Sequence, residues 1–294
     1  MAVIGTNVAS LRAANASTSA NLALQTSMER LSTGARINSA KDDAAGMAIS
    51  DTMTAQIRGM NQGIRNANDG IAMAQTAEGA LGEVNNMLQR VRELTVQATS
   101  GTYSSSDKTN MQAEVTALSA QITSTLANTQ FNGNKLFDAT AGTVTAAVPA
   151  GVAPAPVTPA VPAYSTIKIQ AGANASDSIN LKLADLKNDT TITAATGLDL
   201  TTATNTALTT VDTALKTVST YRAGLGAAQN QMQSAVNNLT TNATNLTSAK
   251  SQIMDADFSA ETTALAKAQI LSQASTAMLS QANQSQQGVL KLLQ

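Results

Sequence analysis

The sequence predicts a mainly α fold in which long, nested, coiled-coil-like helices from both chain ends enclose a small β-hairpin region in the middle. Three features predict it: apolar residues repeat with helical spacing in two long stretches, aromatic residues are few, and all 5 prolines lie in one central segment. Aromatic side chains supply much of the buried area of a wide core, and the chain has 3 Tyr, 3 Phe and no Trp. Its apolar residues are instead Ala, Leu, Val, Ile and 11 Met, which suit narrow seams between helices.

The first long stretch has apolar residues three or four positions apart, which is the pattern of a helix that packs along a seam against partners. At about 1.5 Å per residue it predicts a helix roughly 60 Å long. Glycines interrupt the stretch, and each costs up to about 1 kcal/mol relative to alanine, so the helix depends on tertiary partners. The seam positions are Met53, Ile57, Met60, Ile64, Ala67, Ile71, Ala74, Ala77, Leu81, Val84, Leu88, Val91 and Leu94.

After this helix, residues 100–110 are predicted to form a turn, and a shorter helix follows with its apolar face between Met111 and Leu126. The pair Asn132-Gly133, set between Phe131 and Leu136, indicates a hairpin-type turn.

The middle of the chain changes composition at about residue 138. Its prolines lie in VPAGVAPAPVTPAVPAYS, and because proline blocks helix formation, residues 138–165 are predicted to be an exposed Ala/Pro-rich linker. Apolar and polar residues then alternate around a Gly/Asn/Asp turn, which predicts a β-hairpin. Its apolar positions are Ile167, Ile169, Ile179, Leu181 and Leu183.

Helical spacing resumes near Ala203 and continues to Ile253, which predicts a second long helix. The two termini carry thinner stripes. The N-terminal stripe consists of Ile4, Val8, Leu11 and Ala14, followed by Leu24, Met28 and Leu31. The C-terminal stripe consists of Leu271, Ser275, Met278, Ala282, Ser285, Val289 and Leu292. Small and hydroxyl residues on these stripes bury little area per turn, so neither terminal helix is expected to be stable alone, whereas both are expected to form in an assembly.

Composition excludes several classes of chemistry. The chain has no His and no Cys, so it lacks the usual general acid and base, the ligands of zinc sites and the thiol nucleophile. We therefore expect no enzymatic activity and no cofactor or metal. The formal net charge is −1 with no basic block, which argues against nucleic acid as a partner, and no apolar run approaches the about 18 residues of a membrane span. The segment MAVIGTNVASLRAANAS lacks the basic start and continuous apolar core of a signal peptide.

The segment RLSTGARINSAKDDAAGMAIS, residues 30–50, gathers charge between two glycines. A lysine beside two aspartates suits an active site, a cation site or a phosphate-binding loop, but the same pattern suits a joint between two helices. Gly34 suits a helix stop, and Ser39 and Asp42 have the spacing of a capping box. The cations are expected to form exposed ion pairs with carboxylates, either within one chain or between copies of it. The joint interpretation is favoured. Its residues are Arg30, Arg36, Lys41, Asp42 and Asp43.

The acidic segment IMDADFSAE contains Asp255, Asp257 and Glu261. Hard cations bind clustered carboxylates, but the spacing does not match a dedicated calcium loop, and acidic residues commonly begin a helix. The helix-start interpretation is favoured, with Phe258 packed beside it.

Several blocks, in order, resemble bacterial flagellin, the subunit of the flagellar filament. At the front they are ERLSTGARINSAKDDAAGMAIS, NANDGIAMAQTAEGAL, LQRVREL and TQFNG; at the back they are LGAAQNQMQSAVNNL, SQIMDADFSAETTALAKAQIL and QANQSQQGVLKLLQ. The resemblance covers residues 1–137 and 205–294. The middle departs from the family pattern, because the Ala/Pro stretch intervenes and large outer domains are small or absent.

The resemblance implies a layered subunit of an extracellular filament. The expected ranges are 1–44 for the N-terminal filament-core helix and joint, 45–137 for the N-terminal rod helices, 138–165 for the Ala/Pro-rich linker, 166–204 for the hairpin and variable surface region, 205–253 for the C-terminal rod helix, and 254–294 for the C-terminal filament-core helix.

The resemblance also implies partners. The chain is expected to leave the cell through the flagellar type III export apparatus without a cleaved signal peptide, and to polymerise with itself, and with any sibling flagellins, under the filament cap near the hook-associated proteins. The same terminal residues are expected to contact core neighbours and, before assembly, an export chaperone. They are Ile4, Val8, Leu11, Leu271, Met278, Val289, Leu290, Leu292 and Leu293.

One further surface follows from the segment LQRVRELTVQ. In the family, the matching positions form the main contact to the host Toll-like receptor that senses flagellin, and the same surface serves subunit packing. These positions are Leu88, Gln89, Arg90, Glu93 and Leu94. Two other hypotheses stay open: a hook–filament junction protein of the same family, and an enzyme or ligand-binding protein that uses Lys41, Asp42 and Asp43 or a site in the hairpin region.

Overall fold

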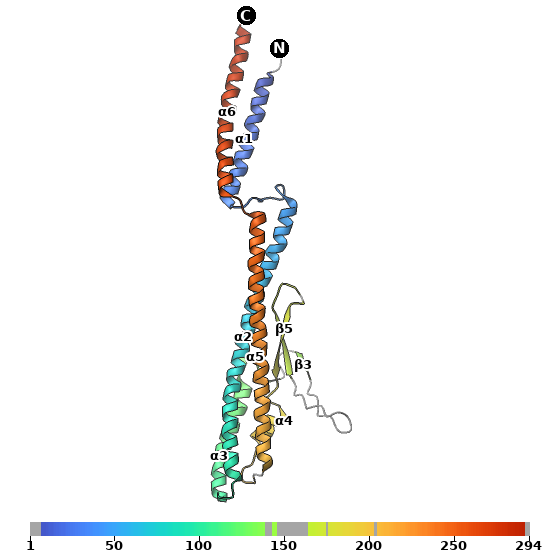
Figure 1. Ribbon diagram of the computed structural model, residues 1–294, viewed down its shortest axis with the longest axis vertical. Helices are drawn as coiled ribbons and strands as arrows, with labels where there is room; N and C mark the ends of the chain where they lie inside the picture. The colour runs from blue at the N-terminus through green and yellow to red at the C-terminus, as the bar shows by residue number, and fades with distance from the viewer. Residues whose placement is uncertain (1–6, 139–142, 146–163, 175, 203–204, 292–294) are drawn as a thin grey trace, which may run out of the picture. The chain divides into compact units, whose positions relative to one another are not determined.

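The computed structural model describes residues 7–138, 143–145, 164–174, 176–202 and 205–291 of the chain (Figure 1). The helices are α1 (Val8–Thr33), α2 (Ala44–Thr99), α3 (Ser105–Asn128), α4 (Thr190–Thr196), α5 (Asn205–Met254) and α6 (Phe258–Lys291). The strands are β1 (Gln130–Phe131), β2 (Asn134–Lys135), β3 (Thr143–Thr145), β4 (Tyr164–Gln170) and β5 (Ser178–Ala184). The predicted mainly α fold is confirmed. Two compact units result, one from residues 1–57 and 244–294, the other from residues 58–243.

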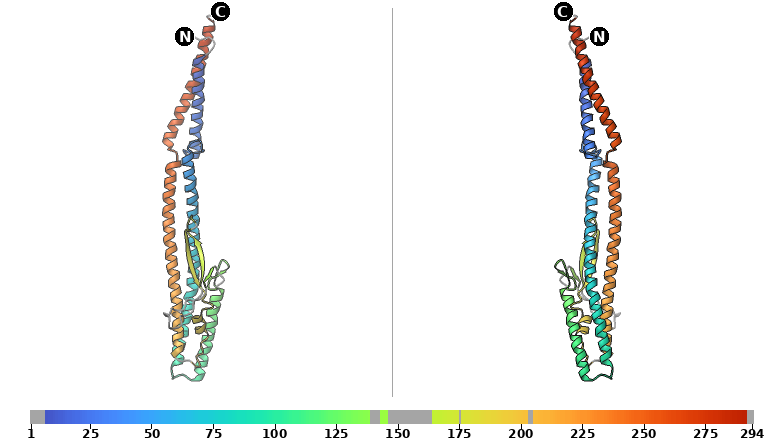
Figure 2. Two further views of the ribbon diagram at one scale, coloured as in Figure 1. Left: turned by 90° about the vertical axis from the view of Figure 1, so that its right-hand side faces the viewer. Right: turned by 90° about the vertical axis from the view of Figure 1, so that its left-hand side faces the viewer.

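In the first unit, α1 and α6 lie side by side and antiparallel, as both views of Figure 2 show. Asn7 Nδ2 donates to the Ala282 carbonyl at 3.1 Å, and Ser272 Oγ donates to Asn21 Oδ1 at 2.8 Å. The fully or almost fully buried positions of the seam are small side chains, namely Ala20, Ser27, Ala268 and Ser275, and the half-buried Leu265 and Leu279 flank the last two along α6. Small seam residues allow close approach of the two helices but bury little apolar area, so the pair gains little from burial per turn.

The stripe predicted for the C-terminal helix is partly wrong. Ser275 lies in the seam, but Leu271 and Met278 do not, because they project from α6 into solvent. The seam instead follows Leu265, Ala268, Ser272, Ser275, Leu279 and Ala282, all buried or half-buried. Both stripes have steps of three and four, so spacing alone could not distinguish the face of α6 that packs against α1 from the face that is exposed.

In the second unit, α2, α3 and α5 bury apolar side chains between them, as predicted from the helical repeats. These side chains form two clusters, and the half-buried Leu215 packs against both. The side chains of Val84, Leu88 and Val91 on α2 are fully buried, and so are those of Val218 and Met232 on α5. Ion pairs and hydrogen bonds at the rim connect the helices: Arg92 Nε lies 2.6 Å from Asp212 Oδ1, and Gln229 Nε2 donates to Glu78 at 3.1 Å.

Helix α3 begins earlier than predicted, so the expected turn over residues 100–110 was too long. Ser104 is the N-cap, and it forms a capping box with Asp107: the Asp107 amide donates to Ser104 Oγ at 3.2 Å and the Ser104 amide donates to Asp107 Oδ2 at 3.0 Å. These bonds satisfy amides that would otherwise be unpaired at the helix start, which allows polar residues to form its first turn.

The hairpin predicted around Asn132-Gly133 is confirmed. Strands β1 and β2 pair antiparallel with Phe131 opposite Asn134, and the two turn residues have φ values of 49° and 80°. Positive φ at both central positions is the geometry that favours Asn-Gly in two-residue hairpin loops. The turn brings Leu136 and Phe137 into the core, where both are almost fully buried.

The second predicted hairpin is also confirmed. Strand β4 pairs antiparallel with β5, with Ile167 opposite Leu181 and Ile169 opposite Ile179. Two short elements were missed: β3, which pairs with β4, and α4, whose N-cap is Asp189 and which buries Ile192. Three and seven residues are too few for a periodic pattern. Strand β3 and the start of β4 fall inside the range expected to be linker, whose prolines lie outside the described residues.

Glycines in α2 explain how the β4–β5 hairpin packs on this helix. A Cβ atom added at Gly63 would lie 2.8 Å from the backbone of Ala171 and Gly172, and one at Gly59 would lie 2.8 Å from Cβ of Ala173. Asn66 Nδ2 donates to the Gln170 carbonyl at 2.9 Å and fixes the contact. Glycine at position 63 therefore lowers helix propensity but allows the backbone of the β4–β5 hairpin to pack closely against α2.

We predict that Gly63→Ala lowers the free energy of unfolding by roughly 1–3 kcal/mol, because the new methyl group overlaps the hairpin backbone. The matched control is Gly79→Ala, where no atom lies within 4 Å of the added Cβ, so its better helix propensity should raise stability by up to about 1 kcal/mol. Denaturant unfolding followed by helical circular dichroism measures both. Equal stability of the two variants would contradict the packing argument.

Candidate functional site

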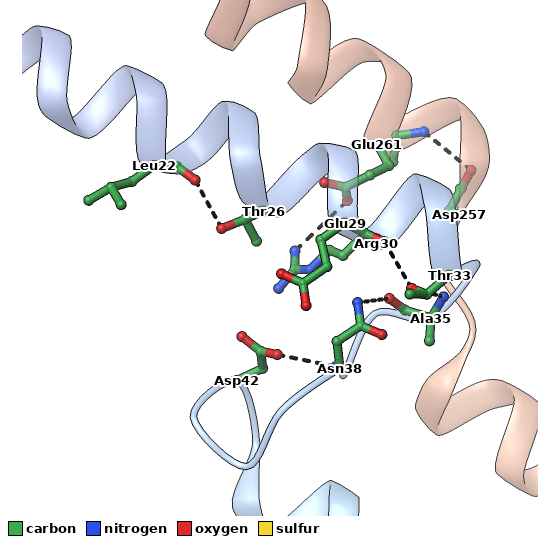
Figure 3. A network of polar contacts seen from close by, with 11 residues as sticks. Leu22, Thr26, Glu29, Arg30, Thr33, Ala35, Asn38, Asp42, Asp257 and Glu261 are labelled. Carbon is green, nitrogen blue, oxygen red and sulfur yellow. Dashed lines mark hydrogen bonds and ion pairs between the residues drawn. The ribbon is translucent and has the colours of Figure 1, made fainter.

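The charged segment predicted to be a joint connects α1 to α2 beside the α5–α6 connection, within the first unit (Figure 3). Helix α1 ends at Gly34, which has a left-handed φ of 71° and donates its amide to the Arg30 carbonyl, so the predicted helix stop is confirmed. Ala35 and Asp255 form an isolated antiparallel bridge, in which the Ala256 amide donates to the Gly34 carbonyl at 3.0 Å. Two connections far apart in sequence are thus hydrogen-bonded to each other.

The predicted capping box of Ser39 and Asp42 is wrong, because a turn, not a helix, follows Ser39. Helix α2 begins at Ala44, and Asp43 caps it by accepting from the Gly46 amide at 2.9 Å. Asp42 Oδ2 instead accepts from the amides of Asn38 and Ser39 at 3.1 and 2.9 Å and so closes the turn.

The hydrogen bonds to Asp42, chiefly from the Ser39 amide, hold the pKa of this carboxyl below its usual value. A lowered pKa in the folded state stabilises the turn above the ordinary carboxyl pKa. That contribution is lost as the pH falls through the lowered value.

The three cations of the joint differ in their partners. Arg30 Nη1 lies 3.8 Å from Glu261 Oε2, so its predicted pairing with a carboxylate is confirmed as a long contact. Arg36 Nη2 donates to the Ile253 carbonyl at 2.8 Å, so within the chain it binds a backbone carbonyl and not a carboxylate. Its pairing with a carboxylate of a neighbouring copy stays a prediction. The last carbonyls of a helix are unpaired and carry partial negative charge, which explains why the guanidinium binds the end of α5. In the described part of the chain, no carboxylate lies within ion-pair distance of the exposed Lys41.

The acidic segment before α6 caps a helix, as predicted. Asp257 Oδ1 accepts from the Ser259 and Ala260 amides at 2.8 and 3.3 Å, and Glu261 faces Arg30. Phe258 was expected to pack here, but it is 70% exposed. Among the described residues, no three acidic side chains are grouped so that they could hold a metal ion. The charges around the joint therefore close turns and cap helices.

The terminal helices expose the apolar side chains expected to make assembly contacts. Val8, Leu11 and Met278 are 48%, 63% and 63% exposed, and Leu271 is exposed as well. Val289 and Leu290 belong to α6, whose side chains are described only to residue 285, and Ile4, Leu292 and Leu293 lie outside the described residues.

Sequence reasoning missed two further exposed residues of these helices, Leu22 on α1 and Ile270 on α6. Leu22 was identifiable, because it follows Leu11 by 11 residues. That separation is about three helical turns, so the two leucines share one face of α1.

The segment around Arg90 divides between the core and the surface. Leu88 and Leu94 are buried, so they support the surface, whereas Gln89, Arg90 and Glu93 are exposed on α2. Arg90 Nη1 lies 2.9 Å from Glu93 Oε2. Its Nε lies 2.8 Å from Oε1 of Glu114 on α3, which sequence reasoning missed because α2 and α3 meet only in the folded chain. The bonds to Glu114 and Glu93 raise the pKa of Arg90 above its ordinary value.

Comparison with known proteins identifies the family of the chain. The family model of the bacterial flagellin N-terminal helical region matches residues 4–142, and that of the flagellin C-terminal helical region matches residues 208–293. The chain belongs to the bacterial flagellin family. It is 42% identical to a flagellin of Bacillus subtilis, over 99% of both chains, and 41% identical to one of Halalkalibacterium halodurans, over 92% of this chain and 91% of that one.

A solved relative of this flagellin is the Bacillus cereus flagellin, which is 30% identical and aligns with a TM-score of 0.47 over 63% of this chain and 94% of that one. None of the helices that the structure describes combines the length and hydropathy needed to cross a bilayer. Flagellins are a structural protein family, and the charged residues of the joint likewise have structural roles, since they cap helices and close turns.

We predict that Asp43→Ala removes the cap of α2, costs about 1 kcal/mol, and speeds hydrogen exchange at the Gly46 and Met47 amides. Asp42→Ala is the matched control, because it carries the same loss of charge one residue earlier, outside the helix. It should speed exchange at Asn38 and Ser39 and leave Gly46 unchanged. Identical exchange patterns in the two variants would rule out the assigned cap.

Proposed function

We propose that the chain is a structural subunit of the bacterial flagellar filament, which polymerises by burying the exposed apolar faces of α1 and α6 against neighbouring copies. The observation that carries this proposal is that each terminal helix exposes large apolar side chains on a face that its partner helix does not cover. The uncovered faces carry Leu11 and Leu22 on α1, and Leu271 and Met278 on α6.

The energetics of the helix pair support assembly. Its seam is built from small residues such as Ala20, Ala268 and Ser275, so pairing within one subunit gains little burial. Each additional apolar side chain buried between copies contributes up to about 1.5–3 kcal/mol. Neighbouring copies therefore supply the stabilisation that the isolated pair lacks.

Within the filament, we assign residues 1–44 and 254–294 to the inner core and residues 45–137 and 205–253 to the surrounding rod. The linker 138–165 and the hairpin region 166–204 are assigned to the outer part. Small seam residues and uncovered apolar faces suit the core, whereas the buried helical core of α2, α3 and α5 suits a rod that is stable by itself.

We further propose that the subunit is exported through the flagellar type III apparatus and assembles outside the cell under the filament cap. The exposed apolar residues Val8, Leu11, Leu271 and Met278 are available to an export chaperone before assembly. Hook-associated proteins are the expected neighbours at the base of the filament. The hook–filament junction role is the second candidate, and deletion separates the two: loss of a junction protein leaves secreted flagellin monomers, whereas loss of the filament subunit shortens or removes filaments.

For the free subunit, we propose that Gln89, Arg90 and Glu93 form a surface bound by the host Toll-like receptor for flagellin. All three are exposed, and Leu88 and Leu94 anchor the helix beneath them. The ion pairs of Arg90 with Glu114 and Glu93 hold its guanidinium in place, which reduces the side-chain entropy lost on binding.

Purified chain is expected to form filaments on filament fragments, visible by electron microscopy. Limited proteolysis should cut the first ~40 residues in the monomer and spare them in the filament, because neighbours then cover the terminal helices. Replacing Leu11 and Leu22 by Ser should abolish elongation without changing the unfolding of residues 58–243. Equal protease protection in monomer and filament would contradict the assembly mechanism.

Replacing Arg90 and Glu93 together by Ala should weaken receptor signalling by the monomer at least about tenfold, because the charge-assisted contacts of both side chains are lost. Arg92→Ala is the control, since Arg92 is an exposed arginine of the same helix that pairs with Asp212 on α5. Unchanged signalling in the double variant, or an equal loss in the Arg92 variant, would count against this surface.

A further inference from the structure

We propose that Met28 and Met278 are sulfoxidation sites of the free subunit, and that oxidation of Met278 blocks its incorporation into filaments. The assignment of the oxidation sites depends only on the exposure of the two side chains and the reactivity of the thioether. The effect on assembly rests on the proposed function, because it requires that the face of α6 carrying Met278 is buried between copies.

Sulfur chemistry in this chain belongs to methionine alone, because the chain has 11 Met and no Cys. The thioether sulfur attacks a peroxide oxygen, the S–O bond forms as the O–O bond breaks, and the peroxide is reduced to water while the sulfur is oxidised to the sulfoxide. The oxidant is hydrogen peroxide or a related two-electron oxidant that reaches an extracellular protein.

Exposure makes this reaction selective. Among the methionines that the structure describes, only Met28 and Met278 are exposed, at 55% and 63%. Met232 is fully buried in the core of the second unit, and Met73 and Met111 are more than nine-tenths buried. Oxidation depends on access of the oxidant to sulfur, so the two exposed thioethers should react first.

The position of Met278 on α6 explains why its oxidation should block assembly. Leu271 and Met278 are seven residues apart and therefore lie on one face of α6, and both are exposed. This face lies outside the seam with α1, so its oxidation leaves the fold of the monomer intact. A sulfoxide is polar, and burying it in an apolar contact without a hydrogen-bond partner is unfavourable. Met28 lies at the edge of the seam near Leu24 and Leu31, which are half-buried, so its oxidation should affect assembly less.

The experiment treats purified monomer with hydrogen peroxide, removes the oxidant with catalase, and maps sulfoxides by peptide mass spectrometry. Elongation of filament fragments is then measured by sedimentation and electron microscopy. Met28 and Met278 should oxidise well before Met73 and Met232, elongation should fall at least about tenfold, and methionine sulfoxide reductases should restore it. Circular dichroism should show unchanged helix content.

Matched variants locate the effect. Met278→Leu should oxidise first at Met28 and still elongate, whereas Met28→Leu should lose elongation on treatment as the unmodified chain does. Met278→Gln introduces a polar side chain without any oxidant and should reduce elongation by itself.

Normal elongation by chain oxidised at Met278, or an equal loss in treated Met278→Leu, overturns the assembly inference. Faster oxidation of Met73 or Met232 overturns the site assignment. If untreated chain does not elongate at all, the proposed function fails together with the assembly inference, while the mass-spectrometric mapping still decides the oxidation sites.

Discussion

The pairing of the two chain ends along a seam of small side chains is the interaction on which the first unit depends. Asn7 and Ala282, 275 positions apart, are hydrogen-bonded, and Ala20, Ser27, Ala268 and Ser275 let α1 and α6 approach closely. The same small residues limit how much apolar area the pair buries, and large apolar side chains such as Leu11, Leu22 and Met278 remain exposed outside the seam. The distribution of small residues inside the seam and large apolar residues outside it therefore explains both the weak α1–α6 pairing and the exposed apolar surface.

At the joint, charged side chains mainly bind the ends of helices. Asp43 and Asp257 cap the starts of α2 and α6, Arg36 binds the end of α5, and Arg30 faces Glu261. Each unpaired backbone group at a helix terminus needs a partner, and a joint that brings four helix ends into one unit has many of them. The cluster that resembles an active site in the sequence is explained by this requirement.

Much of the helical architecture and both hairpins could be predicted, because helix seams and turns depend on the spacing of residues that are close in sequence. Gly34 predicted the end of α1, and Asn132-Gly133 predicted its hairpin. The failures share one cause, which is competition between partners distant in sequence. Arg36 binds a carbonyl 217 positions away, and Arg90 pairs with Glu114 on another helix. No spacing rule contains those partners, and α4 and β3 were too short to show a period.

The sequence by itself determined the helix periods, the turns, the absence of thiol and imidazole chemistry and the membership of the flagellin family. Only the tertiary structure decided which of two similar stripes on each terminal helix is occupied and which is free. It also separated the exposed Arg90 from the buried Leu88 and Leu94 beside it. The physical reason is that helical spacing assigns residues to a face, whereas exposure depends on what packs against that face.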